Sequence, residues 1–337
     1  MFDQKIFKGN LFTWLILFAN SCYTQNQVHQ LLIIGGGPAG YSAGVSAANG
    51  KLDTVIVEGE PGGQATRAGE IKNFPGHESV NGAELAASMR DHAEKLGTKI
   101  IDKQVTRVDF SQTPFKVWTD QPKEPILAHT IIIATGSQPI KINCPGEEQY
   151  WGNGRGIFVC VKCDGHAIID QEVVIIGGGP HALREINNVK QRTSASKITL
   201  INPNKQLTGP QFLINRAQES GIKILNNYTV KQILGDQQHV TGIEVIDNQT
   251  GKISTIKTKW VLVGLGWQPN SQVFKDQVKI NNKNQIEVTS ETNTSIAGVF
   301  AAGDVTSTAR HQLFMASSSG FAAAMDAEKY LRNKNLI

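Results

Sequence analysis

The chain has 337 residues, a length at which about two domains are expected. Hydrophobic residues make up 40% of the chain and charged residues 18%, which excludes a wholly disordered protein. The net charge of +4, spread without a basic run, gives no reason to expect nucleic acid as a partner. The 4 cysteines are too few for a disulfide scaffold, so any role for them is local.

Residues 1–29 differ in character from the rest of the chain. Two lysines precede the apolar stretch Leu11–Ala19, and the small residues of Ala19-Asn20-Ser21 then suggest cleavage before Cys22, as in a secretory signal. The stretch is much shorter than the ~20 residues of a membrane-spanning helix. The alternatives are a mis-assigned start or an apolar arm packed on the body. With a signal, the protein is exported or touches a membrane only through this leader; without one, it is cytoplasmic.

A nucleotide-binding pattern opens the body of the chain. The apolar strand Leu31–Ile34 runs into Gly35–Gly40, which has the G-x-G-x-x-G spacing, and a small-residue helix follows at Ser42–Ala48. A second strand, Thr54–Val57, ends at Glu58, whose carboxylate suits ribose hydroxyls. Strand, glycine turn, helix, strand and acid in this order predict a site that holds a pyrophosphate at a helix N-terminus.

The same opening occurs a second time. Strand Glu172–Ile176 leads into Gly177–Ala182, with alanine in the permitted third place. Two further segments, Ile131–Gly136 and Gly298–Asp304, are strands that end in small-residue turns, and we assign them to the first nucleotide. The first domain is therefore expected to be interrupted by the second and closed by the C-terminal stretch.

These patterns predict an α/β fold with two Rossmann-like, three-layer dinucleotide-binding domains, the second inserted into the first. We place the first domain at 30–143 and 271–337, and the second domain at 144–270. Cys144, beside a Pro-Gly pair in the expected linker, is interpreted as a bystander.

A pair of cysteines lies shortly before the second glycine motif. Cys160 and Cys163 have the spacing of a redox dithiol, Lys162 between them favours a thiolate, and Asp164 can move a proton to or from a thiolate. A zinc site is the alternative interpretation. Cys160, Cys163 and His166 would supply at most three local ligands, whereas a structural zinc site has four. Inert buried thiols are the other alternative.

Taken in order, these motifs resemble the low-molecular-weight thioredoxin reductases. The resemblance covers about residues 30–333, and its most specific element is C-x-x-C-D-G placed just before the second glycine motif. The motifs that carry it are Gly35-x-Gly37-x-x-Gly40, Gly62-Gly63-Gln64, Asn73-Phe74-Pro75-Gly76, Ala134-Thr135-Gly136, Cys160-x-x-Cys163-Asp164-Gly165, Gly177-Gly178-Gly179 and Ala302-Gly303-Asp304.

The resemblance implies a homodimer that binds FAD on the first domain. The implied FAD contacts are Gly35, Gly37, Pro38, Ala39, Gly40, Glu58, Gly63, Gln64, Asn73, Ala134, Thr135, Gly136, Gly303, Asp304 and Gln312. At the second site, Gly177, Gly179 and Ala182 would hold NADPH or a second FAD.

The resemblance also implies roles for the cysteine pair. Cys163 would face the flavin and accept its electrons, Cys160 would attack the disulfide of a thioredoxin-like protein, and Asp164 would serve as the acid–base group. The second domain would swing to bring either the disulfide or the nicotinamide to the flavin.

The second nucleotide site departs from the family pattern. After the strand Ile198–Ile201, the NADPH-using members carry His-Arg-Arg and a further arginine, whereas this chain has Asn202–Lys205. Lys205 is only a point charge, and no acid at the strand end selects NADH. His181 in the second motif and His311, where arginine is usual, also differ.

Three interpretations of the electron path follow. The first is a thioredoxin-reductase-type enzyme that still uses NADPH, but weakly. The second is an NADPH-independent relative that uses ferredoxin, or a second flavin in the pyridine-nucleotide site. The third is a non-enzymatic flavin redox sensor, against which the intact cysteine motif argues.

Overall fold

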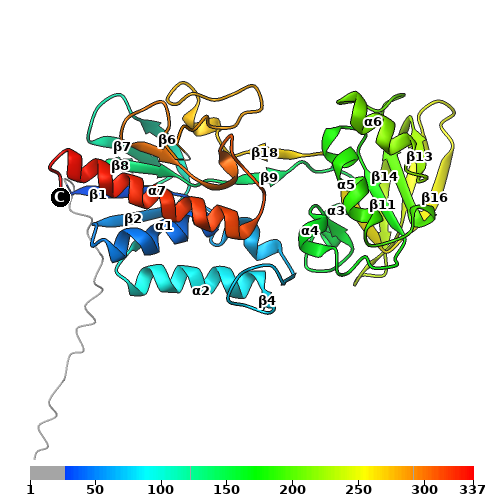
Figure 1. The fold of residues 1–337 in the computed structure, drawn as a ribbon, viewed down its shortest axis with the longest axis horizontal. Coiled ribbons are helices and arrows are strands. Elements are labelled where there is room, and N and C mark those ends of the chain that lie inside the picture. Colours follow the sequence, from blue (N-terminus) through cyan, green and yellow to red (C-terminus); the bar gives the residue numbers. More distant parts are fainter. Residues whose placement is uncertain (1–26, 122, 291) are drawn as a thin grey trace, which may run out of the picture.

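The structure is a computed structural model that describes residues 27–121, 123–290 and 292–337. The predicted leader, with Cys22, lies almost wholly outside these residues. The chain forms two bodies joined by a narrow two-stranded connection, in which β9 (Ser137–Pro139) pairs antiparallel with β18 (Trp267–Pro269) (Figure 1). None of the helices within the described ranges is both long and apolar enough to cross a membrane.

The first body is built on a sheet in the order β5-β2-β1-β8-β7-β6, with β19 added beside β8. Strand β1 runs parallel to both β2 and β8, while the β6–β7 pair is antiparallel. The strands are β1 (Val28–Ile34), β2 (Thr54–Glu58), β5 (Lys99–Asp102), β6 (Val105–Asp109), β7 (Phe115–Thr119), β8 (Ile126–Ile133) and β19 (Val299–Ala301). The central strands are apolar along their length because both faces of the sheet are covered.

Helices α1 (Pro38–Asn49), α2 (Gly82–Lys95) and α7 (Leu313–Asn333) belong to this body, and Figure 1 shows α7 lying beside α1. Helix α1 begins earlier than the predicted Ser42, because Pro38 has the fixed φ angle and the missing N–H that suit the first helical position. The short strands β3 (Glu70–Ile71) and β4 (Val80–Asn81) pair beside α2.

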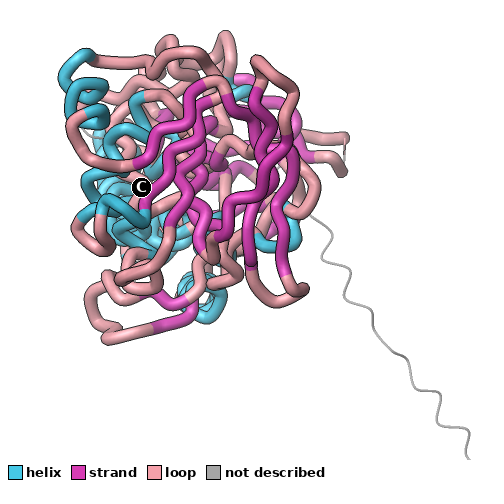
Figure 2. The backbone as a smooth tube through the Cα atoms, turned by 90° about the vertical axis from the view of Figure 1, so that its right-hand side faces the viewer, coloured by secondary structure: helices cyan, strands magenta, loops and turns pink. Residues whose placement is uncertain are grey.

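The second body contains a parallel sheet in the order β10-β17-β11-β12-β13 and an antiparallel sheet β14-β15-β16. Figure 2 faces this body and shows strands across its near side. Its strands are β10 (Ile157–Phe158), β11 (Val173–Ile176), β12 (Ile198–Asn202), β13 (Lys223–Asn226), β14 (Tyr228–Gly235), β15 (Val240–Asp247), β16 (Ile253–Lys257) and β17 (Trp260–Val263). Its helices are α3 (Glu147–Tyr150), α4 (Val161–Asp164), α5 (Pro180–Lys190) and α6 (Gln211–Gln218).

One apolar cluster fills the space between the parallel sheet of the second body and its helices, and another lies between that sheet and the antiparallel one. The predicted α/β class with two Rossmann-like units is confirmed. The exact boundaries at 144 and 270 stay a prediction, although the chain leaves the first sheet before β9 and returns to it at β19.

Candidate active site

The first glycine turn is shaped by close packing at two of its glycines and by free space at a third. A β-carbon on Gly35 would lie 2.4 Å from the carbonyl oxygen of Ala134, and one on Gly40 would lie 1.9 Å from that of Gly35. A β-carbon on Gly37 would meet nothing within 4 Å. The turn is therefore tight, its helix packs directly on the strand, and its middle leaves room for a pyrophosphate.

A cavity of about 380 Å³ opens over this turn. Its walls include the glycine turn, the 57–64 loop, the end of β8 with β9, the 268–274 segment and the segment that follows β19. The predicted contacts that line it are Gly35, Gly37, Pro38, Ala39, Gly63, Gln64, Ala134, Thr135, Gly136, Gly303 and Asp304. Gly40, Glu58, Asn73 and Gln312 do not line it directly.

Glu58 lies beneath the glycine turn rather than on the cavity wall. Its side chain is buried, its Oε2 accepts a hydrogen bond of 2.7 Å from the Tyr41 hydroxyl, and its Oε1 lies 3.1 Å from Nε of Arg90. Arg90 also reaches Asp102 at 2.8 Å. Burial raises the pKa of Glu58 to about 7, and the bond from Tyr41 and the charge of Arg90 oppose that rise.

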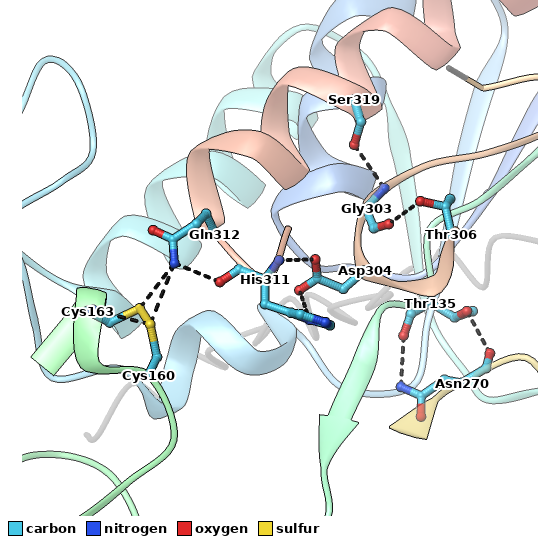
Figure 3. A network of polar contacts seen from close by, with 10 residues as sticks. All are labelled: Thr135, Cys160, Cys163, Asn270, Gly303, Asp304, Thr306, His311, Gln312 and Ser319. Atoms are coloured by element: carbon cyan, nitrogen blue, oxygen red, sulfur yellow. Dashed lines mark hydrogen bonds and ion pairs between the residues drawn. A yellow bond between two sulfur atoms is a disulfide. The ribbon is translucent and has the colours of Figure 1, made fainter. Parts of the chain in front are cut away.

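Asp304 lines the cavity and contacts the residues just before α7. Its carboxylate accepts a 3.1 Å hydrogen bond from the His311 amide, and Trp267 stacks on the His311 ring at 4.7 Å between centroids. On the other side of the cavity, Thr135 and Asn270 exchange two hydrogen bonds of 2.7 and 2.9 Å (Figure 3). These contacts tie the cavity wall to the connection between the two bodies.

Cys160 and Cys163 form a disulfide at the start of the short helix α4. The Cys163 amide donates to the Cys160 sulfur at 3.2 Å, an arrangement that favours a thiolate on Cys160 once the bond is reduced. Nε2 of Gln312 lies 3.5 Å from the Cys160 sulfur and 3.7 Å from that of Cys163 (Figure 3). Oε1 of Gln312 accepts from Asn73 at 3.0 Å, so both predicted residues bring the first body to the disulfide.

Asp164 lies at the end of α4, next to the disulfide. Burial raises its pKa to about 6, and the charge of His166 opposes the rise. Nε2 of His166, just after α4, lies 3.5 Å from Oε2 of Glu70 in β3, so the segment that carries the disulfide contacts the first body. Asp164 therefore exchanges its proton near neutral pH, as a general acid–base group must.

The second glycine turn lies between β11 and α5. Ala182 is fully buried and packs against Gly264, which explains the tolerance for alanine at the third position. Gly177 has a φ of 125°, and a β-carbon on Gly179 would meet only Thr208, at 3.9 Å. This turn thus keeps the open middle that a pyrophosphate requires.

The structure also describes His181 and Cys144, which the sequence singled out. Within the described ranges His181 Nε2 has no hydrogen-bond partner, and burial, with the nearby charge of His311, lowers its pKa. Burial raises the pKa of the free Cys144 thiol to about 11, which makes it unreactive. No cluster of metal-ligating side chains occurs among the residues the structure describes.

Sequence reasoning missed Tyr41, Arg90 and Asn270. Tyr41 follows the glycine motif directly, so its position was a usable signal. Arg90 comes from α2, and Asn270 follows β18, far along the chain from the residues they contact. No local pattern marks such contacts.

The chain matches the model of the pyridine nucleotide-disulphide oxidoreductase family over residues 29–327. It is 37% identical over 317 residues to the thioredoxin reductase of Escherichia coli O157:H7, covering 90% of this chain and 96% of the relative. The chain belongs to the low-molecular-weight thioredoxin reductase family. As a member, it is an FAD-dependent thiol-disulfide oxidoreductase, and the family implies FAD and, in general, NADPH.

Solved thioredoxin reductases match the structure to different degrees. That of Streptococcus pyogenes has a TM-score of 0.85 at 31% identity, covering 91% of this chain and 99% of its own. That of Lactococcus lactis, described as in the FR conformation, has a TM-score of 0.61 at 28% identity, covering 90% and 99%. The two TM-scores therefore differ although coverage and identity are similar.

The first site of this thioredoxin reductase relative fits FAD. Free space above Gly37 and Asp304 on the cavity wall are the features that a pyrophosphate and a polyol chain need, whereas Glu58 is buried against Tyr41 and Arg90 and does not reach the cavity. FAD bound there would supply the two-electron chemistry at the disulfide.

Proposed function

We propose that this protein reduces the disulfide of a thioredoxin-like protein through Cys160 and Cys163. The observation that carries the proposal is the position of the disulfide against Gln312, which leads through His311 to cavity-lining Asp304 (Figure 3). The disulfide therefore lies against the segment that leads to the cavity wall.

The exchange balances as two thiolate attacks. With the pair reduced, the Cys160 thiolate attacks one partner sulfur, forming a mixed disulfide and releasing the other partner sulfur as a thiolate. Cys163 then attacks the Cys160 sulfur, which re-forms the internal disulfide and releases the second partner thiol. The partner gains two electrons and two protons, and Asp164 passes a proton at the attacking or departing sulfur.

Single-turnover reduction of a purified thioredoxin tests the proposal without assuming a donor. Protein reduced with dithionite and freed of excess reductant should reduce thioredoxin in the wild type and in the control Cys144→Ser. Cys163→Ser should keep its flavin, stop at a mixed disulfide on Cys160 and release no reduced thioredoxin. Continued release by Cys163→Ser would show that the pair does not have these roles.

The electron donor is a separate question. The second glycine turn keeps the geometry for a dinucleotide, which supports a bound dinucleotide over ferredoxin as the source of electrons. Both NADPH and a second FAD carry the required pyrophosphate, and the residues at the end of β12 bear on the choice between them.

We also propose a homodimer and keep the leader as an export signal. Phe314, Phe321 and Met325 are exposed on α7, an apolar face that a second copy would cover. Light scattering on the eluted protein measures whether it is a dimer.

The export signal is tested by sequencing the N-terminus of the mature protein, and Cys22 is the first residue expected.

A further inference from the structure

The two glycine turns have the same backbone path, so the first serves as an internal reference for the second. The Gly35 amide donates to the Val57 carbonyl at 2.8 Å, and the Gly177 amide donates to the Ile201 carbonyl at the same distance. Each bond ties the turn to the last residues of the neighbouring parallel strand.

A covering loop repeats as well. The Gly62 amide donates to the Gly36 carbonyl at 2.9 Å, and the Thr208 amide donates to the Gly178 carbonyl at 2.8 Å. The loop after β2 and the loop after β12 therefore approach their turns in the same way.

The two turns share this backbone path, but the side chain at the end of the neighbouring strand differs between them. A β-carbon on Gly36 would lie 1.5 Å from Glu58 Oε2, and one on Gly178 would lie 2.1 Å from Asn202 Oδ1. Asn202 thus occupies, at the end of β12, the place that Glu58 occupies at the end of β2. A neutral amide replaces the carboxylate.

Hydrogen bonds hold the Asn202 amide in one orientation. Its Nδ2 donates to Asn226 Oδ1 at 2.8 Å, and its Oδ1 accepts from the Asn204 amide at 3.2 Å. The residue is fully buried. Asn202 therefore supports the turn from beneath, as Glu58 does in the first site, but it brings no negative charge to that place.

The same surroundings suit a 2′-phosphate poorly. Such a group carries close to two negative charges, which proteins usually meet with arginine. Between residues 202 and 210 the only basic residue is Lys205. The loop after β12 therefore offers a 2′-phosphate only this single lysine.

We propose that the second glycine turn binds a dinucleotide whose adenosine ribose carries a free 2′-hydroxyl, because the loop after β12 offers a neutral amide and a single lysine where a 2′-phosphate would need arginine. NADH and FAD both have this ribose. The proposal rests on the proposed function, because the bound dinucleotide would be the source of electrons for the cysteine pair.

Calorimetry on the full chain with FAD in its first site tests the preference directly. The probes are ADP-ribose and 2′-phospho-ADP-ribose, which differ only in the 2′-phosphate and undergo no redox chemistry. We expect ADP-ribose to bind about tenfold more tightly or better. Equal or tighter binding of the phosphorylated probe would overturn the proposal, and so would failure of both probes with a single flavin per chain.

A charge-adding variant provides the matched comparison. Asn204 is exposed beside the site, so Asn204→Arg should fold normally and reduce or reverse the preference. Gln238→Arg, exposed in the β14–β15 loop, adds the same charge elsewhere and should keep the wild-type ratio. If both variants changed the ratio alike, Asn202 and its loop would not be the determinant.

Flavin content and NADH titration identify which dinucleotide, FAD or NADH, occupies the second site. Two flavins per chain, with the probes excluded, assign the site to FAD; a single flavin with competition by NADH assigns it to NADH. Binding is measured without thioredoxin, so these results stand apart from the single-turnover test. Failure of that test would remove the proposed function and leave the nucleotide preference measured.

Discussion

At the scale of single residues, Glu58 is a buried carboxyl group whose ionisation lowers the stability of the folded protein. Burial raises its pKa to about 7 from the ordinary 4.5, so the folded protein keeps this proton where the unfolded chain has lost it. Stability therefore falls as the pH rises through that window. A shift of this size corresponds to roughly 3 kcal/mol.

Substitution of Glu58 by glutamine should remove that pH dependence. We expect flavin-free Glu58→Gln to gain roughly 3 kcal/mol relative to wild type between pH 5 and pH 8, measured by urea unfolding. Glu60→Gln, at an exposed neighbouring position, is the control and should follow wild type. An unchanged pH dependence in Glu58→Gln would mean that the carboxyl is already ionised throughout.

Asp164 should determine the pH profile of the thiol exchange. Its pKa of about 6, raised by burial, means that the carboxylate form, which accepts a proton from a thiol, accumulates above pH 6. The rate of thioredoxin reduction by reduced protein should rise through pH 6. In Asp164→Asn the rate should be about 100-fold lower and lack this step.

Asp170→Asn, at an exposed position shortly after α4, is the matched control and should keep both rate and profile. A step near pH 6 that survived in Asp164→Asn would assign the titration to another group.

At the residue scale, the sequence predicted the groups that belong to motifs and missed those that do not. Gly35, Gly37 and Gly40 were predictable because each performs a backbone task that only glycine performs at that spacing. Arg90 was not, because it acts on Glu58 from a separate helix. Only the fold brings the two together.

At the scale of elements, the packing of α7 on α1 positions the cavity floor. A β-carbon on Gly320 would lie 1.9 Å from the carbonyl oxygen of Ala39, which itself lines the cavity. The two helices can approach this closely only because residue 320 has no side chain.

Gly320→Ala should therefore destabilise the protein although alanine is the better helix former. The gain in helix propensity is at most about 1 kcal/mol, and overpacking costs typically 1–3 kcal/mol. We expect a lower melting temperature and weaker retention of FAD. Ser318→Ala, on the exposed side of the same helix, is the control, and a Gly320→Ala protein as stable as this control would contradict the contact.

The sequence predicted the presence of strands with a continuous apolar run, but it predicted their first and last residues less well. The buried strand at Leu31–Ile34 was expected, yet β1 begins at Val28, because its pairing with β8 starts at Val28 and Leu127. Start positions depend on such partners from elsewhere in the chain. A local pattern does not contain them.

At the scale of the whole molecule, two bodies are connected by β9 and β18 alone among the paired strands described (Figure 1). The placement observed here brings the disulfide to Gln312. Movement of the second body, which the resemblance implies, stays a prediction.

The repeated glycine motif predicted two nucleotide-binding units, and the return of the chain at Gly298–Asp304 predicted that one is inserted in the other. The relative placement of the bodies was not predictable, because it depends on side-chain contacts such as His166 with Glu70 and Trp267 with His311. Neither pair has any spacing in the sequence that marks it.

Anaerobic reductive titration of the oxidised protein tests most directly whether the cysteine pair exchanges electrons with the bound flavin. Flavin absorption is followed in the wild type and in a Cys160→Ser, Cys163→Ser double variant. The wild type should take up two electrons per chain more than the double variant before its flavin is fully reduced, because a disulfide is a two-electron acceptor. Equal uptake by the two proteins would contradict the account.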